Sequence, residues 1–160
     1  MDIREIDPDQ WERLRDIRLR ALAEAPSAFG SSLAREKGRT EADWRRWLGS
    51  RDGVLLVCID QEAWVGIAGT YVEPEHPDVV WVVSMWVGPE ARRRGVGRLL
   101  LDACVQWARE RPAAEARLWV TLGNQPARTL YEAAGFAPTG VTQPLPSDPS
   151  VQEEELSLRL

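Results

Sequence analysis

The apolar run Val79–Val87 constrains the fold of this chain more than any other feature of its sequence. Every residue in the run is apolar except Ser84. A strand with one face in water alternates apolar and polar side chains, whereas a strand buried on both faces does not. The run therefore predicts a central strand in a sheet that is covered by helices on both sides.

Strand and helix patterns lie on either side of this central strand. Before it, two hairpin-like connections indicate antiparallel pairing of strands, and after it strand and helix alternate. We therefore expect a mixed α/β sheet with α+β character. The whole chain, residues 1–160, is expected to form a single domain. Strands are expected at 3–6, 54–59, 65–72, 79–87, 116–122, 136–141 and 153–160, and helices at 11–25, from Thr40 to 48, from about 98 to 111, and from 125 to 134. Residues 27–39 and the proline-rich segment 143–150 are expected to be loops.

Charge and composition exclude several classes of protein. The chain has 160 residues, 20 basic against 25 acidic side chains and a net charge of -5, which disfavours a nucleic-acid binder. One histidine and two cysteines cannot build a conventional structural zinc site, so no metal is expected. No charged-then-apolar leader and no long apolar run is present, which predicts neither export nor membrane insertion and favours a cytoplasmic protein.

The turn after the central strand carries the clearest chemical signal. Backbone amides at a helix start lack partners and attract anions. Gly95 and Gly97 have no side chain to keep a phosphate away from the backbone, and the surrounding arginines add positive charge. The residues concerned are Arg92, Arg93, Arg94, Gly95, Val96, Gly97 and Arg98. They predict a pyrophosphate site; the alternative is a solvated basic turn whose glycines serve only to start the helix.

Two common nucleotide sites do not fit this turn. The Walker loop requires GxxxxGK followed by Ser or Thr, a string that the chain lacks. The dinucleotide fingerprint GxGxxG lies on the first strand-to-helix turn, whereas here the third glycine is missing and the turn lies mid-chain. The phosphate ligand therefore belongs to another class.

Two motifs resemble those of the GNAT family of N-acetyltransferases. Arg92-x-x-Gly95-x-Gly97 resembles the Q/R-x-x-G-x-G/A motif of that family, and Asn124 with Tyr131 seven residues later resembles its downstream motif. The resemblance implies the GNAT fold, a mostly antiparallel central sheet splayed between its fourth and fifth strands and flanked by helices. It also implies acetyl-coenzyme A as co-substrate and no metal.

The same resemblance assigns roles to individual residues. The backbone of Met85, Trp86 and Val87 would bind the pantetheine arm as an added strand does, with Asn124 near the same arm. The turn Arg92–Arg98 would hold the pyrophosphate largely through main-chain amides. Tyr131 corresponds to the general acid, a phenol that stays protonated at neutral pH and can protonate a departing thiolate. The alternative for Tyr131 is a packing role with its hydroxyl at the rim.

The general base has no assignment from the sequence. The branch of the family that acetylates peptide N-termini carries a glutamate where this chain has Trp119. Glu36 is a candidate carboxylate near the acceptor, although a solvated loop acid is the favoured interpretation. The run Glu153–Glu155 is expected to be a solvated strand entry, with a weaker option of attracting a cationic amine. Cys58 and Cys104 are expected in the core.

These patterns together predict an acetyl-CoA-dependent N-acetyltransferase. A primary amine of a small molecule or peptide would attack the thioester directly in a ternary complex, with no nucleic acid or membrane as partner. Either a monomer or a homodimer is compatible with the sequence, which does not identify the acceptor. A non-catalytic acyl-CoA-binding or regulatory domain is the alternative; Trp119 in place of a carboxylate favours it, and Tyr131 counts against it.

Overall fold

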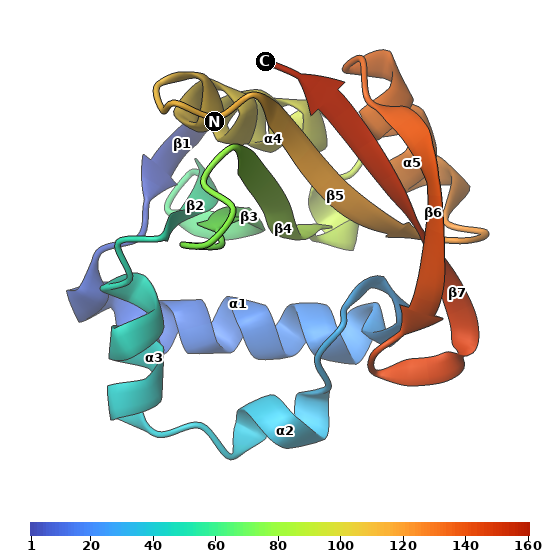
Figure 1. Cartoon of the computed structure of the whole chain (residues 1–160). Helices are drawn as coiled ribbons and strands as arrows, with labels where there is room; N and C mark the ends of the chain where they lie inside the picture. Colours follow the sequence, from blue (N-terminus) through green and yellow to red (C-terminus); the bar gives the residue numbers. More distant parts are fainter.

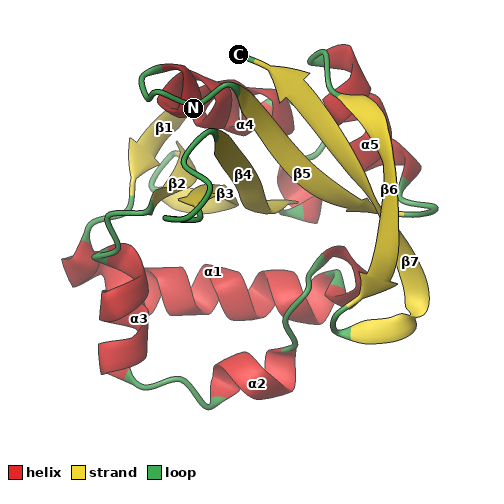
Figure 2. Cartoon of the chain, viewed as in Figure 1, coloured by secondary structure: helices red, strands yellow, loops and turns green.

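A computed structural model describes residues 1–160 as a single sheet with helices on both faces (Figures 1 and 2). The strands are β1 (Asp2–Glu5), β2 (Gly53–Asp60), β3 (Ala63–Val72), β4 (Val79–Val87), β5 (Glu115–Thr121), β6 (Ala137–Leu145) and β7 (Asp148–Arg159). The α-helices are α1 (Trp11–Glu24), α2 (Leu33–Lys37), α3 (Glu41–Leu48), α4 (Val96–Arg109) and α5 (Gln125–Ala133). Short 3-10 segments occupy Pro8–Gln10, Pro26–Ala28 and Pro89–Ala91.

The sheet has seven strands in the order β1-β2-β3-β4-β5-β7-β6, and only the β4–β5 pair is parallel. The prediction of a mixed sheet with Val79–Val87 as a central strand is confirmed. Strand β4 lies between antiparallel β3 and parallel β5. Apolar cores lie on both faces of the sheet, which explains why the sequence of β4 lacks the alternation of a half-exposed strand, although Val83 is 36% exposed.

Strands β4 and β5 separate after a short paired stretch. They pair only from Val79 opposite Glu115 to Trp81 opposite Arg117, although both strands continue further. On its other side, β4 shifts register against β3 near Ser84, which has a positive φ of 57°. Such a bulge bends a strand and increases its twist. The sheet is therefore splayed between β4 and β5, as the family resemblance implies.

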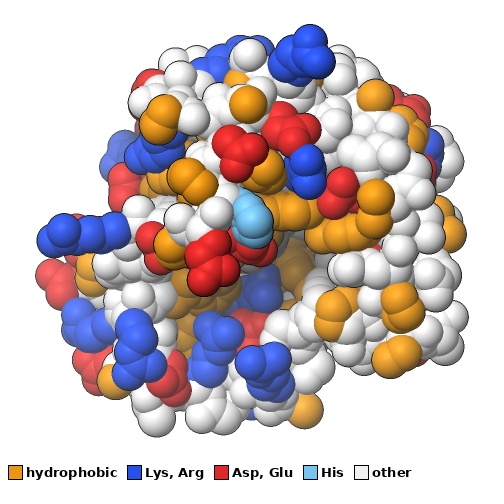
Figure 3. Space-filling model, viewed as in Figure 1, with side chains coloured by type: hydrophobic (Ala, Val, Ile, Leu, Met, Phe, Trp, Pro, Cys, Tyr) orange, Lys and Arg blue, Asp and Glu red, His pale blue; other side chains and the backbone are white.

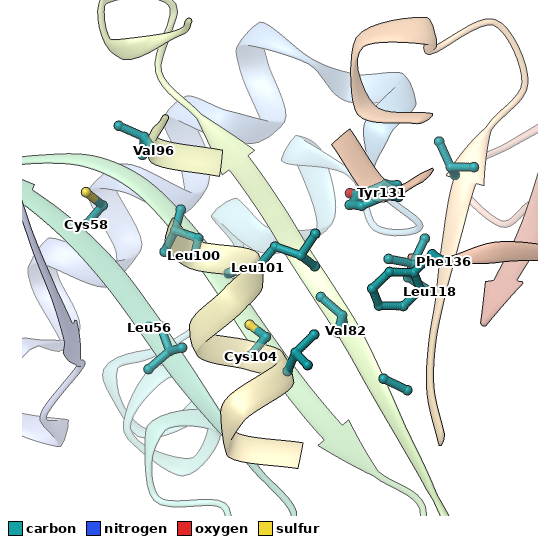
Figure 4. Packing of buried hydrophobic residues seen from close by; sticks show 14 of the residues in the cluster. Leu56, Cys58, Val82, Val96, Leu100, Leu101, Cys104, Leu118, Tyr131 and Phe136 are labelled. Carbon is teal, nitrogen blue, oxygen red and sulfur yellow. The ribbon is translucent and has the colours of Figure 1, made fainter. Parts of the chain in front are cut away.

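Each face of the sheet has its own apolar core. Helices α4 and α5 cover one face, where the cluster includes Leu100, Cys104 and Tyr131 (Figure 4). Helices α1 and α3 cover part of the other face, where the cluster includes Leu14, Trp44 and Trp86. Cys58 and Cys104 are both fully buried, as predicted. None of the helices is long and apolar enough to span a lipid bilayer.

The structure differs from the sequence-based expectation in two segments. The predicted loop 27–39 contains α2, a short helix whose N-cap Ser32 accepts a hydrogen bond from the amide of Arg35. The predicted loop 143–150 is instead part of the β6–β7 hairpin. Proline signals a break because it lacks an amide hydrogen, but an edge strand tolerates it. Strand β6 is the sheet's edge, so Pro138 and Pro144 do not end it.

Candidate active site

A cavity of about 1170 Å³ lies where β4 and β5 separate. One wall comes from Met85–Val87 at the end of β4, and the opposite wall comes from Trp119–Thr121 at the end of β5. The start of α4, one side of α5, the loop between β5 and α5, Val151, and residues 24–28 at the end of α1 and just beyond it complete the lining. One continuous space thus joins the helix-start turn, the gap in the sheet and the segment after α1.

The turn Arg92–Arg98 has the geometry of an anion cradle. Gly95 is the N-cap of α4 with φ 83°, a conformation that glycine adopts without strain, and Arg93 has φ 60°. No backbone carbonyl accepts a hydrogen bond from the amides of residues 93–98. Successive free amides beside a left-handed residue and a helix start form a concave site for anions. The predicted anion site therefore has free donors facing available space.

The four arginines of the turn have different environments. Arg93 lines the cavity and has no carboxylate within ion-pair distance. Arg98 also lines the cavity, but its Nε donates to Asp102 at 2.8 Å. Arg92 donates to the Val87 carbonyl at 3.0 Å and to Glu24 at 2.7 Å. The remaining arginine, Arg94, donates to Asp60 at 2.9 Å and does not line the cavity.

Gly97 lies in the first turn of α4, and Asn124 lies at the start of α5. A Cβ atom built on Gly97 would lie 3.1 Å from a methyl group of Leu130, so a side chain there would also press on α5. Asn124 caps α5, as expected from the sequence, by accepting a hydrogen bond from the amide of Ala127 at 3.4 Å. Both residues line the cavity together with Val96.

Tyr131 lies on α5 and lines the same cavity. Its side chain is buried, with 6% exposure, and its ring packs against Phe136 at a centroid distance of 6.3 Å. Figure 4 shows the hydroxyl pointing away from Phe136. Burial, with a smaller contribution from Cys104, raises the pKa of Tyr131 above its ordinary value. The phenol therefore holds its proton throughout the neutral range.

A family model identifies the relatives of this chain. The model described as the acetyltransferase (GNAT) family matches residues 11–136, which span the central strand, the arginine-rich turn and Tyr131. The chain belongs to the GNAT family of acetyltransferases. GNAT enzymes are acyltransferases, and this assignment confirms the resemblance drawn from the two motifs.

Curated relatives of this GNAT protein carry two kinds of name. A mycothiol acetyltransferase from Thermomonospora curvata is 31% identical over 134 residues, which cover 81% of this chain and 40% of that protein. An uncharacterized N-acetyltransferase from Archaeoglobus fulgidus is 31% identical over 137 residues, covering 82% of this chain and 89% of that protein. The chain thus spans less than half the length of the first relative and most of the second.

Solved structures share the GNAT fold over the whole chain. A ribosomal-protein-alanine N-acetyltransferase from Brucella melitensis has a TM-score of 0.82 at 20% identity, with full coverage of both chains. A putative acetyltransferase from Salmonella typhimurium, solved with acetyl-CoA, has a TM-score of 0.81 at 18% identity and covers 100% of this chain and 94% of that one. At sequence identities this low, the structural similarity shows that these proteins share a fold with this chain.

Glu24 also lines the cavity, although no sequence motif singled it out. One carboxylate oxygen of Glu24 accepts hydrogen bonds from Trp86 Nε1 at 2.9 Å and from Arg92 at 2.7 Å. These bonds, led by the one from Arg92, lower the pKa of Glu24. An acid in the last turn of a helix opposes the helix dipole. Glu24 ends α1, so its unfavourable position is the one signal in the sequence that points to a stabilising partner.

Three carboxylates behave differently from the solvated acids that the sequence favoured. Glu36 is fully buried and pairs with Arg18, because α2 packs against α1. Glu153 and Glu155 are 7% and 6% exposed, and Gln143 and Thr139 of the neighbouring strand β6 donate hydrogen bonds to them. Figure 3 shows a hollow between the sheet and the helices α1 and α2, with apolar, acidic and basic side chains around it.

No group of three or more His, Cys, Asp or Glu side chains in the structure could hold a metal ion. The donors that the cavity offers are instead backbone amides, arginine guanidinium groups and one phenol. These groups bind anions and donate protons, which is the chemistry that a phosphorylated thioester requires.

Proposed function

We propose that this GNAT protein transfers an acetyl group from acetyl-CoA to a primary amine of a small molecule or peptide. One observation carries the proposal: Arg93 and residues 95–98, whose amides donate to no backbone carbonyl, line the same cavity as the phenol of Tyr131. An anion cradle at one end and a proton donor further along match a long ligand with phosphates at one end and a leaving group at the other.

The unpaired strand edges in the cavity suit the arm of acetyl-CoA. Beyond Trp81, the edge of β4 that faces β5 has no strand partner. Free backbone groups on such an edge hydrogen-bond an extended ligand as they would a further strand. Met85, Trp86 and Val87 would hold the pantetheine there, with Asn124 near the same arm. The turn Arg92–Arg98 would hold the pyrophosphate, Arg93 by its side chain and Gly95, Val96 and Gly97 by their amides.

When bound, acetyl-CoA would supply a thioester carbon that is open to attack by an amine. The chain's own contribution begins with placement, because holding both reactants in one cavity removes much of the entropic barrier. Main-chain amides on the free edge of β4 can hydrogen-bond the carbonyl oxygen and stabilise negative charge there. Tyr131 would donate its phenolic proton to the departing sulfur. Because Tyr131 is buried, its pKa is raised, and the phenol keeps its proton until the strongly basic thiolate forms.

The alternative function is acyl-CoA binding without turnover. A thiol-release assay with a broad panel of primary amines, combined with calorimetry of acetyl-CoA binding, separates the two functions. Our proposal predicts binding together with amine-dependent release of coenzyme A. Binding without release for every amine supports the alternative, and absence of binding contradicts both.

A further inference from the structure

Glu153 occupies a specific position beside the cavity. It lies on β7 directly opposite Thr121 of β5, so the two side chains project from the same face of the sheet and lie about 5 Å apart at their Cβ atoms. Thr121 lines the cavity, and so does Val151, which precedes Glu153 by two positions on β7. Side chains two positions apart on a strand share a face. Glu153 is therefore the next side chain beyond the cavity wall.

Glu153 differs from the other shielded acids of this protein in having no cation. Glu36 pairs with Arg18, Glu24 with Arg92, Glu154 with Arg128, and Glu155 lies 3.9 Å from Arg117. No Lys, Arg or His nitrogen lies within 4.0 Å of Glu153. Its side-chain partner is the amide of Gln143, which donates at 2.6 Å.

A buried carboxylate without a counter-ion is costly. Removing a charge from water destabilises a fold unless an opposite charge or several hydrogen bonds replace the solvent. Burial raises the pKa of Glu153, and the bond from Gln143 offsets only part of that effect. An apolar or amide side chain would fit the same place at lower cost. A carboxyl group with this environment, next to a cavity, is typical of functional sites.

We propose that Glu153 binds the ammonium group of the acceptor and takes its proton. This inference rests on the proposed acetyl transfer and deepens it, because it names the missing base and a class of substrate. The acceptor supplies the cation that the protein does not provide. The groups that face Glu153 from neighbouring strands are Gln143 on β6 and Thr121 on β5, and neither carries a charge. On β7 itself, Glu155 shares its face but is shielded by Arg117.

The proton transfers balance in this scheme. The carboxylate of Glu153 takes one proton from R–NH3⁺, which leaves a neutral R–NH2 with a free lone pair. The nitrogen forms a bond to the acetyl carbon, the carbon–sulfur bond breaks, and Tyr131 gives its proton to the sulfur. The amide nitrogen releases its second proton to solvent. Glu153 then loses its proton to solvent, Tyr131 regains one, and both return to their starting forms.

The scheme identifies a class of acceptor. Alkylamines, with a pKa of about 10 for a lysine-type amine, arrive as cations at neutral pH and require both a counter-ion and a base. Weakly basic aromatic amines arrive neutral and require neither. Glu153 therefore selects for alkylammonium acceptors.

The test compares the two amine classes in Glu153→Gln and in a matched control. Glu154→Gln makes the same change on the adjacent residue, whose side chain points to the opposite face and contacts Arg128. With an alkylamine, we expect Glu153→Gln to reduce kcat/KM by about 100-fold or more, the usual contribution of a general base. With an aniline-type amine, we expect a change of less than about threefold, since no proton has to be removed first. Glu154→Gln should retain near wild-type rates with both amines.

Each outcome decides between distinct explanations. Equal losses with both amines indicate a structural role for Glu153 and overturn the inference, as does a loss below about threefold with the alkylamine. The second variant Glu153→Leu, which removes the carboxylate without offering an amide, should reproduce the split between amine classes. A wild-type protein that binds acetyl-CoA and acetylates no amine contradicts the proposed function itself.

Discussion

Arg18 and Glu36 form a two-point ion pair in the interior of this protein. The Nε and Nη2 atoms of Arg18 donate to the two carboxylate oxygens of Glu36 at 2.8 and 2.9 Å, and both side chains are almost completely buried. Arg18 also donates to Ser84 Oγ at 3.2 Å. The pair therefore ties α1 and α2 to the bulge of β4, next to the strand segment that lines the cavity.

Breaking this pair should destabilise the fold strongly. Glu36→Ala leaves the Arg18 charge buried without its partner, a change that typically costs about 3–5 kcal/mol. The free energy of unfolding, measured with a chemical denaturant at pH 7, should fall by that amount. The double variant Arg18→Met with Glu36→Leu should regain most of the loss, because no buried charge remains. A single variant as stable as the wild type would show that the pair contributes little.

Arg93 and Arg94 provide a matched pair of variants for the coenzyme site. Arg93 lines the cavity without a carboxylate partner, whereas Arg94 is engaged by Asp60 outside it. Arg93→Gln should weaken acetyl-CoA binding about fivefold to tenfold at low salt, the effect of losing one charge-assisted contact. Arg94→Gln should leave the affinity nearly unchanged. Calorimetry at two ionic strengths measures the affinity of both variants for acetyl-CoA. An equal loss of affinity in the two variants would contradict the placement of the phosphates.

The cysteines should be unreactive in the folded protein. Cys58 and Cys104 have no exposed surface, and burial raises the pKa of Cys104 to about 12. A thiol reagent at pH 8 should label neither cysteine in the native state and both after unfolding. Direct transfer also predicts that no acetyl-cysteine forms, which mass spectrometry of the protein incubated with acetyl-CoA can verify. Rapid labelling of Cys104 in the native protein would reopen a cysteine-dependent mechanism.

Replacing Glu153 should stabilise the protein while it impairs transfer to alkylamines. Burial raises the pKa of Glu153 in the folded state, so the folded protein binds its proton more tightly than the unfolded chain. Stability is therefore lost as the pH rises from the unfolded pKa through the folded pKa. Glu153→Gln removes this loss.

At pH 8 the melting temperature of Glu153→Gln should exceed that of the wild type by about 2 °C or more, and the difference should vanish near pH 4. Calorimetric scans at the two pH values measure both. A variant that melts below the wild type at pH 8 would show that the carboxylate is stabilised by groups other than Gln143.

The sequence was most informative where a local pattern determined the structure. The bounds of β4 follow from an apolar run with the single polar residue Ser84, and the Asn124 cap follows from the chemistry of a helix start. Helix α2 was missed because five residues are too few to display a helical period. Strands were predicted at 136–141 and 153–160, but the extension of β6 and β7 through 143–150 was missed because Pro144 signals a break only if the strand is not an edge.

The candidate site likewise has residues that sequence motifs located and residues whose environment only the fold determines. The turn Arg92–Arg98 and Tyr131 could be located by their motifs, and the structure brings both to one cavity except for Arg94. The environment of Glu36 depends on Arg18, which lies on another helix, and that of Glu153 depends on Gln143, its partner across a hairpin whose register the sequence did not reveal. The burial of an acid is a property of the tertiary fold, so the sequence favoured the ordinary solvated state for both.

The most direct test of acetyl transfer at this cavity compares thiol release by the wild type and by Tyr131→Phe at saturating acetyl-CoA and amine. The variant keeps the buried ring and loses only the proton donor. We predict an unchanged affinity for acetyl-CoA and a turnover reduced at least about tenfold, equivalent to about 1.4 kcal/mol of transition-state stabilisation. Turnover equal to that of the wild type would remove Tyr131 from the mechanism and contradict the proposed role of the cavity.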